Sequence, residues 1–268
     1  MDITSSLNIE NGPFSKNVPV EKLYTNDNRD EILARLTYTA AHHGFAILTA
    51  PPGSGKSTLL RKLSTALDPT KYIFIYISDS NLSPKWLYND ILAQLGLPLF
   101  NYRGDGRKMV QSQIDLIESN TGKHLVVCID EAHLLAKETI EEIRFLLNTN
   151  MDSASPLALI LVGQNELKTR LRDPRFLAVR QRIDMVCSVD ALDGIELKTY
   201  IQKHLDLIDE KVDDLFAPEA LQRIYERSRG VPRTVNTICG KSLLQASITG
   251  ASIVTDSIVK GVIDAELF

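Results

Sequence analysis

The feature that most constrains this sequence is a glycine-rich octapeptide between an apolar run and a helix-forming run. It reads APPGSGKS over residues 50–57, with the apolar residues 45–48 before it and residues 58–63 after it. Glycines let a backbone fold around phosphate oxygens, and the N–H groups of such a loop and of the next helix form an anion site. The segment therefore predicts a P-loop that binds a nucleoside triphosphate.

Several residues of this loop have an expected contact with the nucleotide. Lys56 is expected to reach the β- and γ-phosphates, and Ser57 to ligate Mg²⁺. The first position of the usual pattern holds Ala50 instead of glycine, and a small residue still fits there. ATP and Mg²⁺ are the expected cofactors, and the cofactor-binding residues are Pro52, Gly53, Ser54, Gly55, Lys56, Ser57 and Thr58. A glycine-rich turn without nucleotide is the alternative.

A second motif is an apolar run that ends in two carboxylates. Residues 125–129 read LVVCI and are followed by Asp130 and Glu131, as in a Walker B strand. Asp130 is expected to hold Mg²⁺ through water, and Glu131 to polarise the attacking water as the general base. The two motifs together predict Mg²⁺-dependent hydrolysis of ATP to ADP and phosphate. Residues 130–133 also spell the helicase DEAH box, but the chain lacks room for a second helicase core, so we interpret His133 as an incidental helix-start residue.

Apolar runs alternate with helical patterns through most of the chain. This alternation predicts an α/β fold in which a parallel five-stranded sheet lies between helices. The expected strands are residues 45–48, 72–77, 125–129, 157–162 and 185–189. The expected helices of this part are residues 30–42, 56–67, 84–95, 107–119, 137–148 and 174–181.

After residue 189 the strand signal ends and only helical patterns follow. They cover residues 194–208, 218–228, 232–249 and 255–267. A chain of 268 residues is long enough for one large α/β domain and a smaller one. We therefore expect an N-terminal segment over residues 1–28, an ATPase core over residues 29–190 and an all-helical lid domain over residues 191–268.

The composition narrows the functional classes. Cys128, Cys187 and Cys239 lie far apart in apolar surroundings, so they support neither disulfides nor zinc and are expected to be reduced core residues. No apolar run approaches the length of a membrane span, and a cytoplasmic protein without membrane contact is expected. A net charge of −4 argues against a broad nucleic-acid-coating surface, but it leaves open a local basic stripe repeated around an oligomer.

Further polar residues follow the later strands. Gln164 comes after the fourth expected strand, where a side-chain amide would hold the attacking water or the γ-phosphate. Planar, permanently charged guanidinium groups suit the charge that develops on phosphate oxygens. The arginines in such positions are Arg180, Arg182 and Arg233. An ordinary loop amide, and arginines that are exposed or ion-paired, are the alternatives.

Taken in order along the chain, these motifs resemble the AAA+ ATPases of the ExeA-like group. The resemblance rests on the P-loop, the Walker B strand, GQNEL at residues 163–167, RQRI at residues 180–183, GVPRTVN at residues 230–236, and PFSK at residues 13–16. It implies an AAA+ P-loop NTPase fold, with Gln164 as sensor 1 and Arg233 as sensor 2. Arg182 or Arg180 would be the arginine finger, which acts in the neighbouring subunit's site. The resemblance therefore also implies a homo-oligomer, either a ring or a helical filament.

Two functional branches share this ATPase module. The compact chain resembles the transposition regulators related to TnsC and MuB, and we take this branch as the main hypothesis. It implies an ATP-dependent DNA-binding ATPase that oligomerises on double-stranded DNA without sequence preference and recruits or activates a DDE transposase during target selection. The alternative is an ExeA-like ATPase that acts in secretion or in the assembly of envelope machinery. A nucleotide-holding signalling switch of the STAND kind is a third class.

Basic residues alternate with aromatic ones after the second expected strand. In the transposition-regulator branch this region tracks the DNA backbone, and repetition around an oligomer gives salt-sensitive binding. The DNA-binding candidates are Lys85, Arg103, Arg107 and Lys108, with Trp86, Tyr88 and Tyr102 between them. The alternative is that the aromatic residues pack a helix and that the basic residues form a solvated face.

Overall fold

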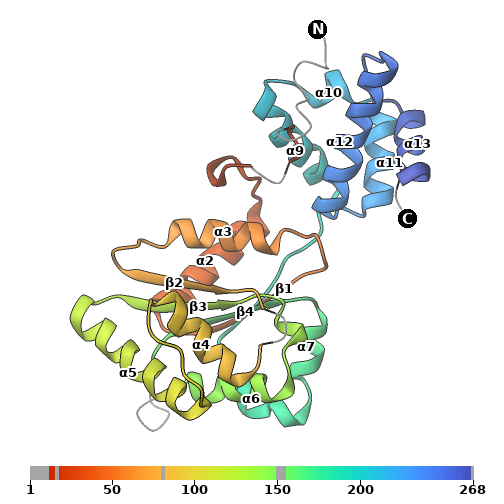
Figure 1. Ribbon diagram of the computed structural model, residues 1–268. Coiled ribbons are helices and arrows are strands. Elements are labelled where there is room, and N and C mark those ends of the chain that lie inside the picture. Colours follow the sequence, from red (N-terminus) through yellow and green to blue (C-terminus); the bar gives the residue numbers. More distant parts are fainter. Residues whose placement is uncertain (1–11, 16–17, 80–81, 149–154, 267–268) are drawn as a thin grey trace. The chain divides into compact units, whose positions relative to one another are not determined.

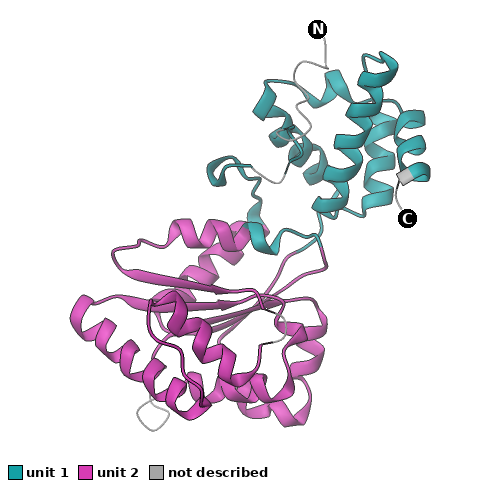
Figure 2. Cartoon of the chain, in the orientation of Figure 1, with its two compact units in different colours: residues 1–27, 53–58, 190–268 teal, residues 28–52, 59–189 magenta. Residues whose placement is uncertain are grey.

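The computed structural model of the protein describes residues 12–15, 18–79, 82–148 and 155–266 (Figure 1). Their contacts divide the chain into two compact units (Figure 2). One unit consists of residues 28–52 and 59–189, and the other of residues 1–27, 53–58 and 190–268. Residues 1–11, 16 and 17 of the predicted N-terminal segment, which include Lys16, lie outside the described residues.

The unit of residues 28–52 and 59–189 is built on a parallel sheet. Its strands are β1 (Phe45–Thr49), β2 (Tyr72–Ile77), β3 (His124–Ile129), β4 (Ala158–Gly163) and β5 (Met185–Ser188). They lie in the order β2-β3-β4-β1-β5, and every neighbouring pair is parallel. Strands that are buried on both faces read as continuous apolar runs. The predicted α/β fold with a five-stranded parallel sheet is therefore confirmed.

Helices cover both faces of this sheet (Figure 1). Successive strand residues point to opposite faces, so Ile47 belongs to one core and Leu48 to the other. The first core is closed by α4 (Pro84–Gln94), α5 (Arg103–Thr121), α6 (Lys137–Leu146) and α7 (Glu166–Leu171). The second core is closed by α2 (Asp27–Ala41) and α3 (Lys56–Ala66).

The helices differ from the prediction at their ends and in short turns. Helix α5 begins at Arg103 instead of residue 107, although glycines are poor helix formers. Its Gly106 is buried against Tyr88 of α4, so tertiary packing extends the helix. The predicted helix over residues 174–181 is divided into η4 (Pro174–Phe176) and α8 (Leu177–Arg180). Short elements that the sequence did not predict are η1 (Val20–Lys22), η2 (Ala132–Leu134), α7 and α10 (Val212–Leu215).

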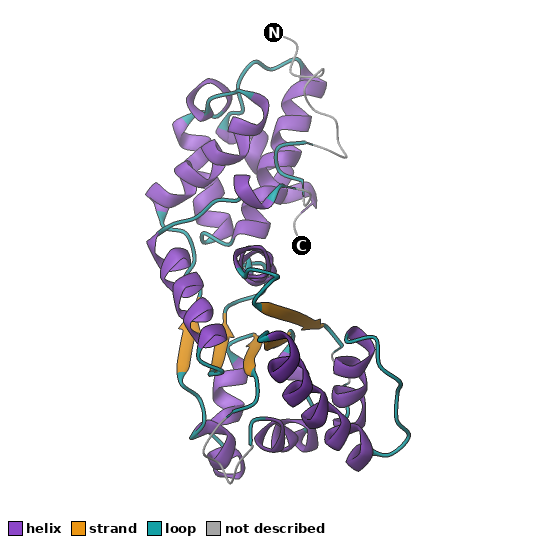
Figure 3. Ribbon diagram, turned by 90° about the vertical axis from the view of Figure 1, so that its left-hand side faces the viewer, coloured by secondary structure: helices purple, strands orange, loops and turns teal. Residues whose placement is uncertain are grey.

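The other unit is built from helices (Figure 3). After residue 190 they are α9 (Gly194–Leu205), η5 (Asp206–Ile208), α10, α11 (Pro218–Ser228), α12 (Pro232–Thr249) and α13 (Asp256–Glu266). Helix α9 opens with a capping box, in which Asp193 and Glu196 each accept the other's backbone N–H. The N-terminal segment packs against α9, because His204 Nδ1 donates to the Pro13 carbonyl at 2.7 Å and Phe14 stacks on the His204 ring.

Two expectations from composition can be compared with this fold. Cys128, Cys187 and Cys239 are buried and form no disulfide, as predicted. Burial raises the pKa of the Cys128 and Cys239 thiols, which keeps them protonated and unreactive. Across the described ranges, no helix is long and apolar enough to cross a membrane.

Candidate nucleotide-binding site

The P-loop runs from the carboxyl end of β1 to the first turn of α3. Ala50 is fully buried and its N–H donates to the carbonyl oxygen of Gly163 at 3.2 Å, which explains the small residue at this position. Gly53 and Gly55 have φ angles of 80° and 95°, which side chains disfavour. Lys56 is the first residue of α3 and is only 7% exposed. The loop thus has the glycine conformations and the helix-start lysine that phosphate binding requires.

Arg233 lies against the glycine-rich part of this loop. Its backbone N–H donates to the carbonyl oxygen of Gly53 at 3.1 Å. A Cβ atom on Gly53 would lie 2.8 Å from the Cβ of Arg233, so a larger residue would push α12 and the loop apart. The Arg233 side chain is exposed. The predicted sensor 2 residue therefore lies beside the phosphate loop, within one compact unit.

Asp130 follows β3 at the carboxyl edge of the sheet. It is 4% exposed, and its carboxylate accepts the Glu131 N–H at 2.8 Å and the Tyr76 hydroxyl at 2.7 Å. Burial and the bond to Asp130 raise the pKa of Tyr76, which keeps this hydroxyl a donor. A carboxylate has about four lone-pair positions, so two remain for a hydrated cation. Asp130 therefore fits the predicted Mg²⁺ role.

Tyr76 is a site residue that the sequence did not reveal. It stands within the apolar run of β2, and only the pairing of β2 with β3 brings it to Asp130. We expect Tyr76→Phe to raise the Mg²⁺ concentration needed for half-maximal ATP turnover by about tenfold. Loss of a residue that orients a metal ligand lowers the metal affinity by roughly that factor. ATPase activity measured across a Mg²⁺ series checks this. Tyr102→Phe, at a 75% exposed tyrosine, is the control, and an unchanged Mg²⁺ series for Tyr76→Phe would contradict the role.

Glu131 and Gln164 are joined by His133. The His133 Nδ1 atom lies 3.5 Å from a Glu131 carboxylate oxygen and 3.4 Å from the backbone N of Gln164. Glu131 has a φ of 49°, a left-handed conformation that is uncommon for a side-chain residue and recurs at functional sites. His133 lies in the short helix η2, as expected of a helix-start residue, and the fold also places its ring beside two predicted site residues.

The turn that carries His133 is fixed from two sides. The Arg170 guanidinium of α7 donates to the carbonyl oxygens of His133 and Leu135. Gly163, the last residue of β4, approaches the turn so closely that a Cβ there would lie 3.1 Å from the His133 backbone N. This bracing keeps Glu131 and Gln164 at the same edge of the sheet.

The two predicted finger arginines lie at the end of α8, where Arg180 is its last residue and Arg182 follows it. Arg180 is exposed and donates to the Arg172 carbonyl at 3.0 Å, while Arg182 is half-buried and donates to the Ala178 carbonyl at 2.9 Å. Both guanidinium groups therefore have backbone contacts within their own unit. The other predicted loop residues are Ser54, which is buried, Thr58, which is half-buried, and Pro52 and Ser57, which are exposed.

The DNA-binding candidates are partly engaged inside the fold. Tyr88 is fully buried and its hydroxyl donates to Glu142 at 2.7 Å, so it cannot stack on a base. The buried Glu142 also lies 3.5 Å from Arg103. The Arg107 guanidinium lies over the Phe145 ring, 4.7 Å from its centre. Lys85, half-buried, lies over Trp86 at 5.3 Å, and Lys108 is exposed.

Comparison with known proteins identifies the core. Residues 39–171 match the family described as AAA domain. The chain is also 32% identical over 256 residues to General secretion pathway protein A of Aeromonas hydrophila. This similarity covers 92% of the chain but 45% of that relative's length. It supports the resemblance to the ExeA-like group and does not extend to TnsC or MuB.

Solved structures with the same fold are distant in sequence. Cdc6p from Pyrobaculum aerophilum has a TM-score of 0.68 at 19% identity, over 90% of this chain and 67% of its own. Drosophila ORC bound to DNA has a TM-score of 0.68 at 16% identity, over 98% of this chain and 65% of its own. The Thermotoga maritima RuvB Holliday junction branch migration motor has a TM-score of 0.54 at 20% identity, over 90% of this chain and 69% of its own. At these identities the likeness shows the fold alone. Residues 39–171 therefore match an AAA domain, and the chain has the fold of the AAA P-loop NTPases.

Proposed function

We propose that this protein binds ATP with Mg²⁺ and hydrolyses it. The observation that carries the proposal is the combination, in an AAA fold, of a glycine-rich loop after β1 with two adjacent carboxylates after β3. Lys56 and the loop N–H groups would hold the phosphates, and Ser57 and Asp130 would hold the cation. Bound Mg²⁺ would neutralise charge on the phosphate oxygens.

The remaining site residues would either activate the attacking water or stabilise charge on the phosphates. Glu131 would accept a proton from the attacking water, and Gln164 would orient that water or the γ-phosphate. Arg233 would stabilise charge on the phosphates, because its planar guanidinium fork suits phosphate oxygens. These roles imply that mutations can separate nucleotide binding from turnover: Lys56→Ala should lose binding, and Glu131→Gln should lose turnover alone.

We further infer that the ATPase serves secretion or envelope machinery instead of transposition. The support is the similarity to General secretion pathway protein A over 92% of this chain. Deleting the gene in its native host should reduce the export of secreted proteins, and wild type should restore export where Glu131→Gln does not. Unchanged export in the deletion strain would exclude this role.

The transposition hypothesis predicts that ATP promotes binding to DNA, and the secretion proposal predicts that it does not. We expect ATP not to raise the affinity for random duplex DNA, because Tyr88 is buried, Arg103 pairs with Glu142 and the net charge is −4. Fluorescence anisotropy of labelled duplexes across a salt series, with and without a non-hydrolysable ATP analogue, measures this. Tight binding that requires nucleotide would favour transposition instead. In that case Lys108→Ala should reduce the salt slope by about one unit.

A further inference from the structure

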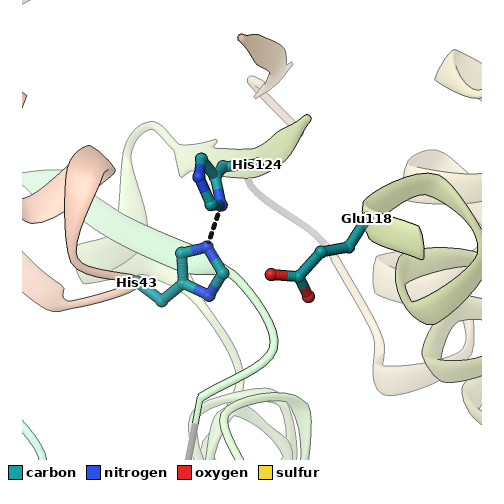
Figure 4. A group of neighbouring side chains, drawn as sticks. All are labelled: His43, Glu118 and His124. Atoms are coloured by element: carbon teal, nitrogen blue, oxygen red, sulfur yellow. Dashed lines mark hydrogen bonds between the residues drawn. The ribbon is translucent and has the colours of Figure 1, made fainter. Parts of the chain in front are cut away.

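Three potential metal ligands meet at the amino ends of β1 and β3, away from the phosphate loop. His43 precedes β1, His124 begins β3, and Glu118 lies near the end of α5. Their nitrogen and oxygen ligand atoms all lie within 4.8 Å of one another. Figure 4 shows a ring nitrogen of His43 facing a ring nitrogen of His124, with the Glu118 carboxylate beside His43. The three residues come from segments far apart in sequence but belong to one compact unit.

His43 occupies a backbone position that glycine would hold more easily. After α2 ends, the Gly44 N–H donates to the Thr39 carbonyl at 2.9 Å, and His43 between them has a φ of 51°. This is a helix C-terminal motif in which the left-handed residue is usually glycine, because a side chain is strained there. The strained conformation directs an imidazole towards the amino edge of the sheet.

A backbone carbonyl contacts one ring nitrogen of His43, and the other ring nitrogen faces His124. The Nδ1 atom of His43 lies 3.1 Å from the Ser155 carbonyl oxygen, which can only accept, so Nδ1 carries the proton and Nε2 a lone pair. A backbone carbonyl on the second ring nitrogen is the arrangement typical of metal-binding histidines. That Nε2 lies 2.5 Å from Nδ1 of His124, closer than the usual distance of about 2.9 Å for a hydrogen bond from nitrogen.

We propose that His43, Glu118 and His124 bind one Zn²⁺ ion. Two imidazole nitrogens and one carboxylate oxygen are a common zinc ligand set, with a fourth position left to water. Bonds of about 2.0 to 2.1 Å in a tetrahedron separate the ligand atoms by roughly 3.3 Å, which small side-chain rotations reach from the present distances. Nitrogen ligands disfavour Mg²⁺ and Ca²⁺, which prefer oxygen. A direct hydrogen bond between the two histidines without metal is the alternative.

The place of this site in the fold indicates a structural role. It ties the turn between α2 and β1 to α5 and to the start of β3, whereas the phosphate loop leaves β1 at its other end. His43 and His124 are half-buried and Glu118 is exposed, so an ion can enter from solvent. We therefore expect Zn²⁺ to raise the melting temperature without being needed for ATP hydrolysis.

The test is direct Zn²⁺ binding to the full chain after treatment with a chelator. Titration against a chromophoric chelator should give one bound Zn²⁺ per chain, and a 100-fold excess of Mg²⁺ should not displace it. His43→Gly removes a ligand and also relieves the left-handed strain, so it should weaken binding at least tenfold while the metal-free protein melts no lower than wild type. Glu118→Gln, at an exposed position, should weaken binding as well.

The chain provides a matched control in His42, the exposed neighbour that stacks on Tyr38. His42→Ala should bind Zn²⁺ as wild type does. Absence of saturable binding, or equal binding by wild type and His43→Gly, would overturn the proposal and leave a histidine pair joined by a hydrogen bond. ATPase activity of His43→Gly should equal that of wild type, since the site lies at the opposite end of β1 from the P-loop.

Discussion

Glu131→Gln should leave ATP binding intact and lower the turnover rate by a factor of about 10² to 10⁴, the usual contribution of a general base. The amide keeps the size and shape of the carboxylate but cannot accept a proton from water. Glu131 is 42% exposed at its side chain, so its loss should not disturb the core. Binding of a fluorescent ATP analogue and phosphate release under saturating ATP measure the two effects separately.

Two variants make this result interpretable. Lys56→Ala should lose nucleotide binding itself, because it removes the buried charge at the start of α3. Glu138→Gln, an exposed carboxylate in the first turn of α6, should behave as wild type in both assays. Substantial phosphate release by Glu131→Gln would remove Glu131 as the base and direct attention to the neighbouring His133.

The central strands β1, β3 and β4 could be predicted closely because they are buried along almost their whole length. Each of them is a nearly continuous apolar run, so the sequence marks where it begins and where it ends. The sequence therefore also shows where β1 ends and the P-loop begins, and where β3 ends before Asp130. Expected and observed bounds agree within one residue at each of these strand starts and ends.

Side-chain contacts that depend on sheet register or on helix packing could not be predicted from the sequence, because they join residues that lie far apart along the chain. Tyr76 reads as one more apolar residue of β2 until β3 pairs beside it. Tyr88 has the same amphipathic character, and the sequence could not decide between base stacking and the buried bond to Glu142 that the fold shows. His43 and His124 are separated along the chain, and only the shared amino edge of the sheet joins them.

The cellular role is harder to predict than the chemistry for a physical reason. Hydrolysis depends on a few side chains at fixed places in the fold, whereas a partner is chosen by surface residues that differ among proteins with the same site. Motifs shared by the whole ATPase module therefore left both transposition and secretion open, and we took transposition as the main hypothesis. Our proposal of a secretion role rests instead on the similarity to General secretion pathway protein A along 92% of this chain.

The largest effect is expected from the arginine finger, if the site is completed by a second copy of the chain. Arg182→Ala should lower turnover by about 10³-fold or more, as loss of such fingers does, while ATP binding persists. Arg35→Ala, which breaks an exposed ion pair with Glu31 on α2, is the control and should cost little. The same substitution at Arg180 decides which of the two arginines is the finger.

Mixing distinguishes a finger that acts in the neighbouring subunit from one that acts in its own. Arg182→Ala keeps its P-loop and Lys56→Ala keeps its finger, so each is inactive alone but an interface between them can combine both intact parts. At a one-to-one ratio about one interface in four has this composition, and activity should recover towards that fraction. No recovery at any ratio, with mixed oligomers confirmed by light scattering, would place the arginine in its own subunit's site. Recovery would instead show that ATP lies between subunits, so that each turnover is sensed by two copies of the chain at once.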